Sequence, residues 1–420
     1  MAYFEILLPL GLILLLSKLL SMVCQRFGLP KVIGMLIAGL LLGLIRYIPS
    51  QTIFTVGEGG TLEGLSFIAK IGVILIMFSA GLETDLTQFK KTGWSCVVIT
   101  ALGVIIPCGL GFLVATLFNG GFSMLSQNLY DNIFYGVILS ATSVSVTVAT
   151  LKELGKLNGK LGASIISAAI LDDIIGVILL SLVIGLKNSS VSGVSSGAGE
   201  VLWMIGKMLI FFALAVAVGV LIHKVFKWMD EKWPHKLRVS VFGLAICFLY
   251  SYCAEKIFGV ADITGAFIAG MVLSGLKNTS DLDYRVETSN YMIFSPVFFA
   301  NICLTTTFNG LNMAFVGFGL AYVFIGLLGK VLGGGLGGLI CKYGIKDSLR
   351  VGIGMMARAE VVLVCTQKGI DNGMVDPAIM PFVLILIIVS SLLTPLLLKL
   401  SYKKQYVTLE HLPVETNQSN

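Results

Sequence analysis

The stretch LGASIISAAILDDIIGVILLSLVIGL, residues 161–186, is apolar except for two adjacent acids near its middle, Asp172 and Asp173. It is long enough to cross a lipid bilayer as a helix. An ionisable side chain at the bilayer centre costs about 2.5–3.5 kcal/mol on insertion scales, so a functional role is the default hypothesis for it. Two adjacent acids also repel each other. The sequence therefore has to supply a group that neutralises them.

The whole chain has the composition of an integral membrane protein. Of its 420 residues, 56% are hydrophobic and only 12% are charged, and the mean hydropathy is +0.94. Soluble domains carry about 25% charged residues. The eight cysteines are scattered without Cys-x-x-Cys spacing, and the three histidines lie at span ends or in the tail. This pattern indicates neither a disulfide framework nor a resident metal site.

Hydropathy predicts thirteen membrane-spanning segments. They cover residues 4–24, 29–45, 65–82, 96–118, 132–151, 161–186, 201–223, 237–254, 260–276, 289–308, 313–341, 350–367 and 377–399. The loops that follow odd-numbered spans, together with the C-terminal tail, hold twenty Lys and Arg residues. The loops that follow even-numbered spans hold four. The positive-inside rule then predicts an outside N-terminus and a cytoplasmic C-terminus in the cell's inner membrane. The basic balance reports topology and indicates no nucleic-acid partner.

Thirteen spans of this orientation permit an inverted repeat. Spans 1–6 start outside and spans 8–13 start inside, with span 7 as the link. This arrangement of spans is typical of a secondary transporter whose halves are related by a pseudo-two-fold axis in the membrane plane.

Two spans in corresponding places are irregular. Residues 140–147 of span 5 read SATSVSVT, where hydroxyls either bond back to their own helical turn or mark a local unwinding. In span 12, Arg358 and Glu360 would point about 160° apart on a regular helix. Either that helix is broken, or each side chain finds a partner on a neighbouring span.

A buried cation lies in span 11. Lys330 stands in the glycine-rich run GLLGKVLGGGLGG and is too far from either interface to reach water comfortably. It needs a carboxylate, and Asp172 or Asp173 can supply it. Only one of them can face it well, because adjacent helical residues point about 100° apart.

These motifs resemble the NapA-type branch of the bacterial monovalent cation:proton antiporters, over roughly residues 5–400. The matching strings are ATSVSVT (141–147), LDDIIG (171–176), GKVLG (329–333), MMARAEVVL (355–363), FSAGLETDL (78–86), GVADITGAFIAGMVLSG (259–275) and PVFF (296–299). The resemblance implies an all-α inverted-repeat fold with two crossing broken helices. It also implies a homodimer that contacts membrane lipid.

The resemblance further divides the transmembrane domain, residues 1–400. A dimerisation part covers about 1–95 and 237–308, a core transport part covers about 96–186 and 313–400, and 201–223 form a linker helix. Residues 401–420 are a polar cytoplasmic tail. The chain stops at Asn420 without the regulatory nucleotide-binding domain of Kef-type relatives, so gating by such ligands is not expected. Residues 298–308 lack the acid that relatives carry there, which bears on regulation or interface details.

The same resemblance assigns roles in exchanging Na⁺ or Li⁺ for protons, without an enzyme activity or a cofactor. Asp173 would hold the cation or a proton in turn, with Na⁺ bound at Asp173 and Asp172, and Asp172 would pair with Lys330. Two further roles complete the site. Thr142 and Ser143 would border it, and Glu360 and Arg358 would compensate charge at the paired crossover. If Lys330 is also protonated and deprotonated, exchange is electrogenic, with a part in pH homeostasis.

Other functions stay open at this stage. A potassium/proton antiporter, a transport-inactive sensor on the same fold and a passive channel share much of this pattern. An intramembrane aspartyl protease would also use two membrane acids, with Asp262 as a conceivable partner. The Tyr-Asp and Gly-x-Gly-Asp strings of such proteases do not accompany these acids. Asp262 itself either caps the helix of span 9 or lies on the ion path.

Overall fold

The computed structural model describes residues 3–406, apart from 27–30, 47, 49–51, 56–59, 85–91, 155, 157–158, 192–197, 233–237, 275, 277–278 and 306–311. Every regular element in the described residues is helical. The main helices are α1 (Leu7–Arg26), α2 (Lys31–Ile45), α3 (Thr61–Leu82), α5 (Trp94–Phe118), α6 (Leu125–Ile138), α7 (Val144–Glu153), α8 (Lys160–Val191), α9 (Ala198–Lys232), α10 (Arg238–Cys253), α11 (Asp262–Leu273), α12 (Thr279–Ser289), α13 (Ser295–Thr305), α14 (Met313–Ile340), α15 (Ile345–Gly354), α16 (Glu360–Asp371) and α17 (Met380–Tyr406). Short 3-10 turns are η1 (Tyr3–Ile6), η2 (Gly121–Met124) and η5 (Pro377–Ile379), and π-helical segments are η3 (Ala254–Phe258) and η4 (Asn290–Phe294).

The all-α fold predicted from the sequence is confirmed. Each of the thirteen predicted ranges contains helix among the described residues, and two of the ranges are interrupted near the middle. Eight of the helices are individually long and apolar enough to cross a membrane. The crossing of all thirteen segments remains a prediction.

Two boundaries differ from the sequence-based expectation. The linker expected at 201–223 is part of α9, which continues to Lys232, and its most apolar stretch is Leu209–Trp228. Lys224 and Lys227 do not end it, because long basic side chains can reach the interface while the helix continues. Helix in the region of span 10 already begins at Thr279, in the polar α12, and runs through η4 into α13.

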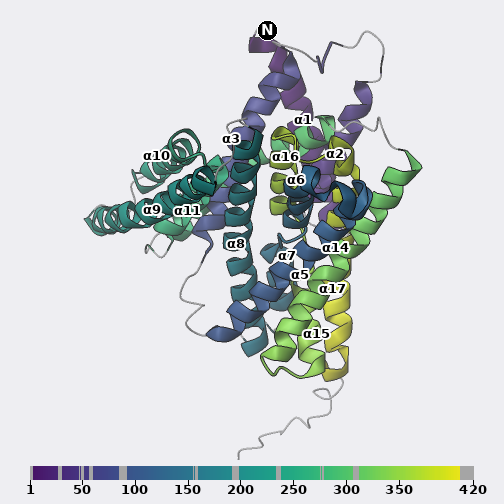
Figure 1. The fold of residues 1–420 in the computed structure, drawn as a ribbon. Helices are drawn as coiled ribbons and strands as arrows, with labels where there is room; N and C mark the ends of the chain where they lie inside the picture. The colour runs from purple at the N-terminus through teal and green to yellow at the C-terminus, as the bar shows by residue number, and fades with distance from the viewer. Residues whose placement is uncertain are drawn as a thin grey trace, which may run out of the picture.

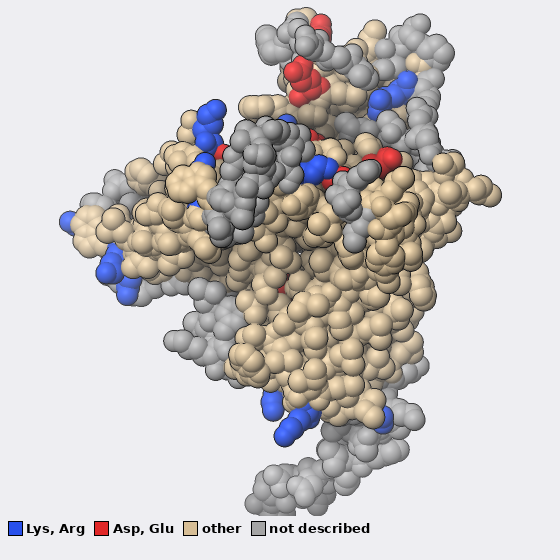
Figure 2. All heavy atoms as spheres, viewed as in Figure 1, with Lys and Arg blue, Asp and Glu red and all other residues tan. Residues whose placement is uncertain are grey.

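The helices pack in two groups. The first helix group joins α1, α2, α3, α10, α11, α12 and α13, and the second helix group joins α5, α6, α7, α8, α14, α15, α16 and α17. Figure 1 shows α9, α10 and α11 together on one side of α8, with α5, α7, α14 and α17 on the other. The face shown in Figure 2 has a broad band with few Lys, Arg, Asp or Glu side chains, and most of its charged side chains lie near the edges, as a surface in contact with lipid requires.

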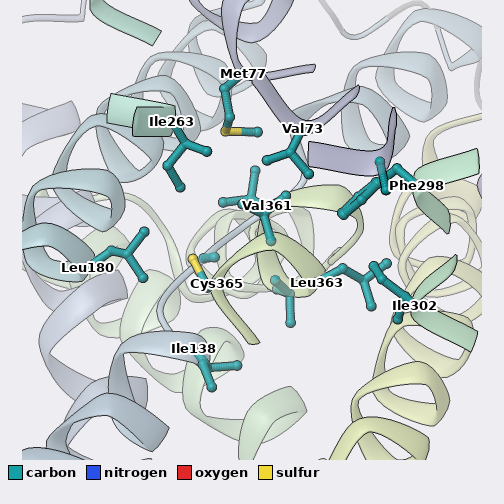
Figure 3. Close-up of a cluster of buried hydrophobic side chains, with 14 of the residues drawn as sticks. Val73, Met77, Ile138, Leu180, Ile263, Phe298, Ile302, Val361, Leu363 and Cys365 are labelled. Atoms are coloured by element: carbon teal, nitrogen blue, oxygen red, sulfur yellow. The ribbon is translucent and has the colours of Figure 1, made fainter. Parts of the chain in front are cut away.

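The two groups meet along an apolar seam. On one side of the seam, helix α16 contributes Val361, Leu363 and Cys365. The first helix group faces them, as Figure 3 shows, with Val73 and Met77 of α3, Ile263 of α11, and Phe298 and Ile302 of α13. All eight side chains are buried. Such a seam contributes dispersion and area burial but few directional bonds that would fix one group against the other.

Candidate functional site

The buried lysine meets one of the two acids. Lys330 Nζ lies 2.8 Å from Asp172 Oδ2, and both side chains have no solvent exposure. Lys330 sits on α14 and Asp172 on α8, so the ion pair crosses between two long helices of the second helix group. Because a buried ion pair is favourable only with good geometry and further hydrogen bonds, its surroundings decide its strength.

Glycine lets α14 approach its neighbour closely. A Cβ placed on Gly333 would lie 2.5 Å from the carbonyl oxygen of Leu102 in α5. Any side chain at this position would push the two helices apart, so glycine is required for the close approach. The glycine-rich run around Lys330 therefore fixes the helix that carries the lysine.

A third group shares the same carboxylate oxygen. The Thr142 hydroxyl donates a hydrogen bond to Asp172 Oδ2, and Thr142 is also buried. The other oxygen of Asp172, Oδ1, is buried and accepts no hydrogen bond from the atoms that the structure describes. The carboxylate is thus bound on one side and has acceptor capacity left on the other.

Asp173 lies beside this pair in a less buried position. Its side chain is partly exposed, whereas Asp172 is fully buried. It is close enough to Lys330 of α14 and to Cys365 of α16 to interact electrostatically with both. The two acids therefore have different surroundings, as expected for adjacent residues of one helix.

The first irregular span is interrupted by an unwound segment. Helix α6 ends at Ile138, α7 begins at Val144, and residues 141–143 are not helical. Of the two readings that the sequence left open, the unwound one is correct, although the Ser140 hydroxyl also bonds back to the carbonyl of Val137 at 2.7 Å. The buried Ser143 lies at this break, where its backbone N–H donates to the carbonyl of Ala357 at 2.8 Å.

The second irregular span is broken opposite the first. Helix α15 ends at Gly354, α16 begins at Glu360, and residues 356–359 are not helical. The Thr147 hydroxyl donates to the carbonyl of Gly354 at 2.6 Å, which gives a partner to a carbonyl at the end of α15. Together with the bond between Ser143 and Ala357, this contact ties the two breaks together, so the interrupted helices cross at this point.

Arg358 is the cation of the crossing. Its guanidinium has no solvent exposure and donates to the carbonyls of Leu139 (2.6 Å), Ala141 (2.6 Å) and Gly326 (2.8 Å). Leu139 follows the last residue of α6, where helix carbonyls lack partners and the helix dipole is negative. Sequence reasoning required either a broken helix or a partner on a neighbouring span, and the structure has both, with backbone carbonyls as the partners. The side chain of Glu360 lies outside the described residues.

Sequence analysis did not single out the residues that hold the second break in place. The Ser390 hydroxyl of α17 accepts the backbone N–H of Arg358, and the Ser391 hydroxyl donates to the Arg358 carbonyl, each at 3.1 Å. Both serines are buried and satisfy backbone groups that the broken helix leaves unpaired. The available signal was the pair of adjacent hydroxyl residues in the span 377–399, whose other polar residues are Thr394 and Lys399 near its end.

Comparisons with known proteins match nearly the whole chain. The profile of a family described as "Sodium/hydrogen exchanger, transmembrane" matches residues 11–400. A Na⁺/H⁺-K⁺ antiporter, GerN of Bacillus cereus, is 31% identical over 402 residues, covering 95% of this chain and 97% of that protein. A Na⁺/H⁺ antiporter of Enterococcus hirae is 32% identical over 399 residues, covering 94% and 98%.

A solved structure shares the fold. The sodium proton antiporter MjNhaP1 of Methanocaldococcus jannaschii superposes with a TM-score of 0.69 at 18% sequence identity, covering 97% of this chain and 99% of that one. At this identity the likeness speaks for the architecture alone.

Proposed function

The chain belongs to the sodium/hydrogen exchanger family, and we propose that it is a secondary antiporter that exchanges a monovalent cation for protons across a membrane. The observation that carries the proposal is the buried Asp172–Lys330 pair beside Asp173, at the crossing of two broken helices. Relatives that match nearly the full chain are named antiporters, which supports a transporter over a protease or a channel.

The chemistry of exchange follows from competition for one carboxylate. Asp173 can be neutralised by a proton or by a cation, but binding of one weakens binding of the other. The acceptor capacity left on Asp172 offers an oxygen ligand nearby, whereas the Ala141 carbonyl at the break already accepts from Arg358. Na⁺ held by oxygens from both acids would replace a proton on Asp173.

Lys330 gives the exchange its electrical character. When the cation binds Asp172, the lysine loses its anionic partner and releases its proton, so that two protons cross for each cation. Net charge then moves in every cycle, worth about 2.3 kcal/mol per charge per 100 mV. Retention of both acids and the lysine argues for active transport over a transport-inactive sensor on the same fold.

Sodium or lithium is the proposed cation, and the Asp-Asp pair supports the proposal that the chain belongs to the NapA-type branch. Potassium is the second candidate, because the printed name of the Bacillus cereus relative includes K⁺ beside Na⁺. The site's oxygen ligands suit either ion, and the distinction depends on their spacing.

The two helix groups are proposed as two working parts. The first helix group would form the dimerisation part of a homodimer, the second would carry the site as the core part, and α9 would link them. The N-terminus would lie outside and the C-terminus in the cytoplasm, in the inner membrane. Packing within each group and the apolar seam between them support this division.

The test is proton flux in proteoliposomes supplied in turn with Na⁺, Li⁺ and K⁺. Asp173→Asn should abolish cation-driven proton movement while the protein still inserts and melts normally. Asp131→Asn is the matched control, since Asp131 lies in the middle of α6, pairs with Lys187 of α8 and is partly exposed. Near wild-type exchange by Asp173→Asn, or no exchange by the wild type with any of the three ions, would overturn the proposal.

A further inference from the structure

A water-accessible pocket lies between the two helix groups. It has a volume of about 270 Å³, enough for several water molecules, and opens between α3, α11 and α13 of the first group and α16 of the second. Its polar lining consists mainly of Lys70, Asp262, Asn301, Gln367, Lys368 and Asp371. Val73, Phe298 and Val364 also line it, so the pocket adjoins the apolar seam.

One ion pair bridges the two groups in this pocket. Lys368 Nζ of α16 lies 2.7 Å from Asp262 Oδ1 of α11, and the two side chains are 22% and 18% exposed. Asp262 Oδ1 also accepts the backbone N–H of Ile263 at 2.8 Å, but Asp262 is the first residue of α11 and the N-cap position, Ala261, has no side-chain cap bond. The cap that was one of the two expectations for Asp262 is therefore not found. The same carboxylate interacts with Glu255 of η3 and contacts Lys368 of the other group.

The pair can hold only while the groups are close. An ion pair needs its nitrogen and oxygen within about 4 Å, so parting of α11 and α16 by a few ångströms breaks it. Below it, the seam residues make only apolar contacts, which tolerate sliding better than directional bonds do. A hydrogen bond between the Ser181 hydroxyl of α8 and the Thr264 hydroxyl of α11, 2.8 Å long, also joins the two groups near here. Among the described residues, Asp262–Lys368 is the salt bridge between the two groups.

We infer that Asp262 and Lys368 form a latch that closes the transport path on this side, the outer side in the proposed topology. This inference rests on the proposed function, because a latch between the groups has a role only if they move to expose the site alternately. When the ion pair is formed, it favours the conformation in which the seam is closed and water from this side reaches no further than Val73, Phe298 and Val364. Open, it admits water and cation along the seam toward Cys365 and Asp173.

The Asp262–Lys368 ion pair is weak enough to break readily. Partly exposed ion pairs contribute modestly, so its loss should change the ratio of closed to open states by about twofold to fivefold. Asp371 lies three residues after Lys368 on α16, within reach as a substitute partner. Lys70 lines the same pocket and can approach Asp262 when Lys368 leaves. The Asp262 carboxylate and the Lys368 ammonium therefore each stay near an opposite charge after the pair breaks.

The test measures opening at Cys365, a native cysteine in the seam that is 1% exposed. A membrane-impermeant maleimide is added to one side of oriented vesicles, and labelling of the Cys365 peptide is followed by mass spectrometry. The variants are Asp262→Asn, which keeps a side-chain oxygen for the N–H of Ile263, Lys368→Gln, and the charge swap Asp262→Lys with Lys368→Asp. Lys187→Gln is the matched control, because it breaks a similarly exposed ion pair that lies within the second helix group.

Each neutralising variant should raise the labelling rate by about twofold to fivefold, and the charge swap should return it toward the wild-type rate. The Lys187→Gln rate should equal that of the wild type. Unchanged labelling in both single variants, or a swap that labels as fast as they do, would overturn the latch. Labelling is read without transport, so failure of the latch and failure of the antiporter proposal are distinguishable.

A second measurement does not depend on labelling. In the Asp262→Cys, Lys368→Cys variant, a short bis-methanethiosulfonate forms a disulfide with each thiol and releases methanesulfinate, which should tether α11 to α16 and stop exchange. Reduction of the two disulfides by a dithiol should restore exchange. Wild-type protein treated in the same way controls for the native cysteines. Full exchange by the tethered protein would contradict the latch.

Discussion

Removal of both charges of the buried pair should harm the protein less than removal of either one. In Asp172→Asn, the Lys330 ammonium keeps its full burial but loses its anion. In Lys330→Gln, the Asp172 carboxylate keeps only the Thr142 hydroxyl among its present partners. Breaking a buried pair by removing one partner costs about 3–5 kcal/mol, whereas replacing both charges is often neutral or mildly stabilising.

The magnitude follows from the complete burial of both side chains. If the two losses were independent, the double variant would lose about 6–10 kcal/mol. With the 2.8 Å contact of the structure, the double variant should be at least as stable as the better single variant. The coupling energy should therefore be several kcal/mol, well above the about 0.5 kcal/mol that distant sites show.

The assay is a series of melting curves in detergent at several scan rates, because large membrane proteins often unfold irreversibly. A parallel cycle with Asp131→Asn and Lys187→Gln, a partly exposed pair, should give a coupling of only about 0.2–1 kcal/mol. Additive losses for Asp172 and Lys330 would refute the reasoning, since they would mean that the two side chains do not interact.

Three further predictions concern other parts of the molecule. Arg358→Lys keeps the charge but loses the planar guanidinium that reaches three carbonyls. The free energy of unfolding should fall by at least about 3 kcal/mol for two lost charge-assisted hydrogen bonds, and the melting temperature and exchange rate should fall with it. A wild-type melting temperature would contradict this. A membrane potential clamped with valinomycin should accelerate or reverse exchange, and identical rates with and without it would indicate one-for-one exchange. Burial, together with repulsion from Glu287, holds the pKa of Asp283 in α12 above its usual value. The protonated form of Asp283 therefore contributes stability at acidic pH, and this contribution is lost as pH rises through the raised pKa. Because Asn stays neutral, Asp283→Asn should raise the melting temperature at alkaline pH more than at acidic pH. Equal changes in melting temperature at both pH values would refute this prediction.

Composition and hydropathy alone predicted the class of protein and marked the charged groups of the candidate site. Hydropathy located helix in every predicted range, because the membrane requires long apolar segments whose backbone bonds are internal. Charges at the centre of such segments cost so much that Asp172, Asp173, Lys330 and Arg358 stood out without any structure. The irregular composition of 140–147 and the Arg358–Glu360 spacing also marked both places where helices break.

Residue patterns alone left open which groups meet, although the family resemblance implied the pairing of Asp172 with Lys330 that the structure has. The choice of Asp172 over Asp173 as the partner of Lys330 depends on the rotation of α8 against α14, and residue spacing along one helix carries no information on that rotation. Arg358 binds carbonyls of other segments, and backbone carbonyls leave no mark in a sequence. The pairing of Asp262 with Lys368 joins residues more than a hundred positions apart, in a pocket that exists only once the two helix groups have packed.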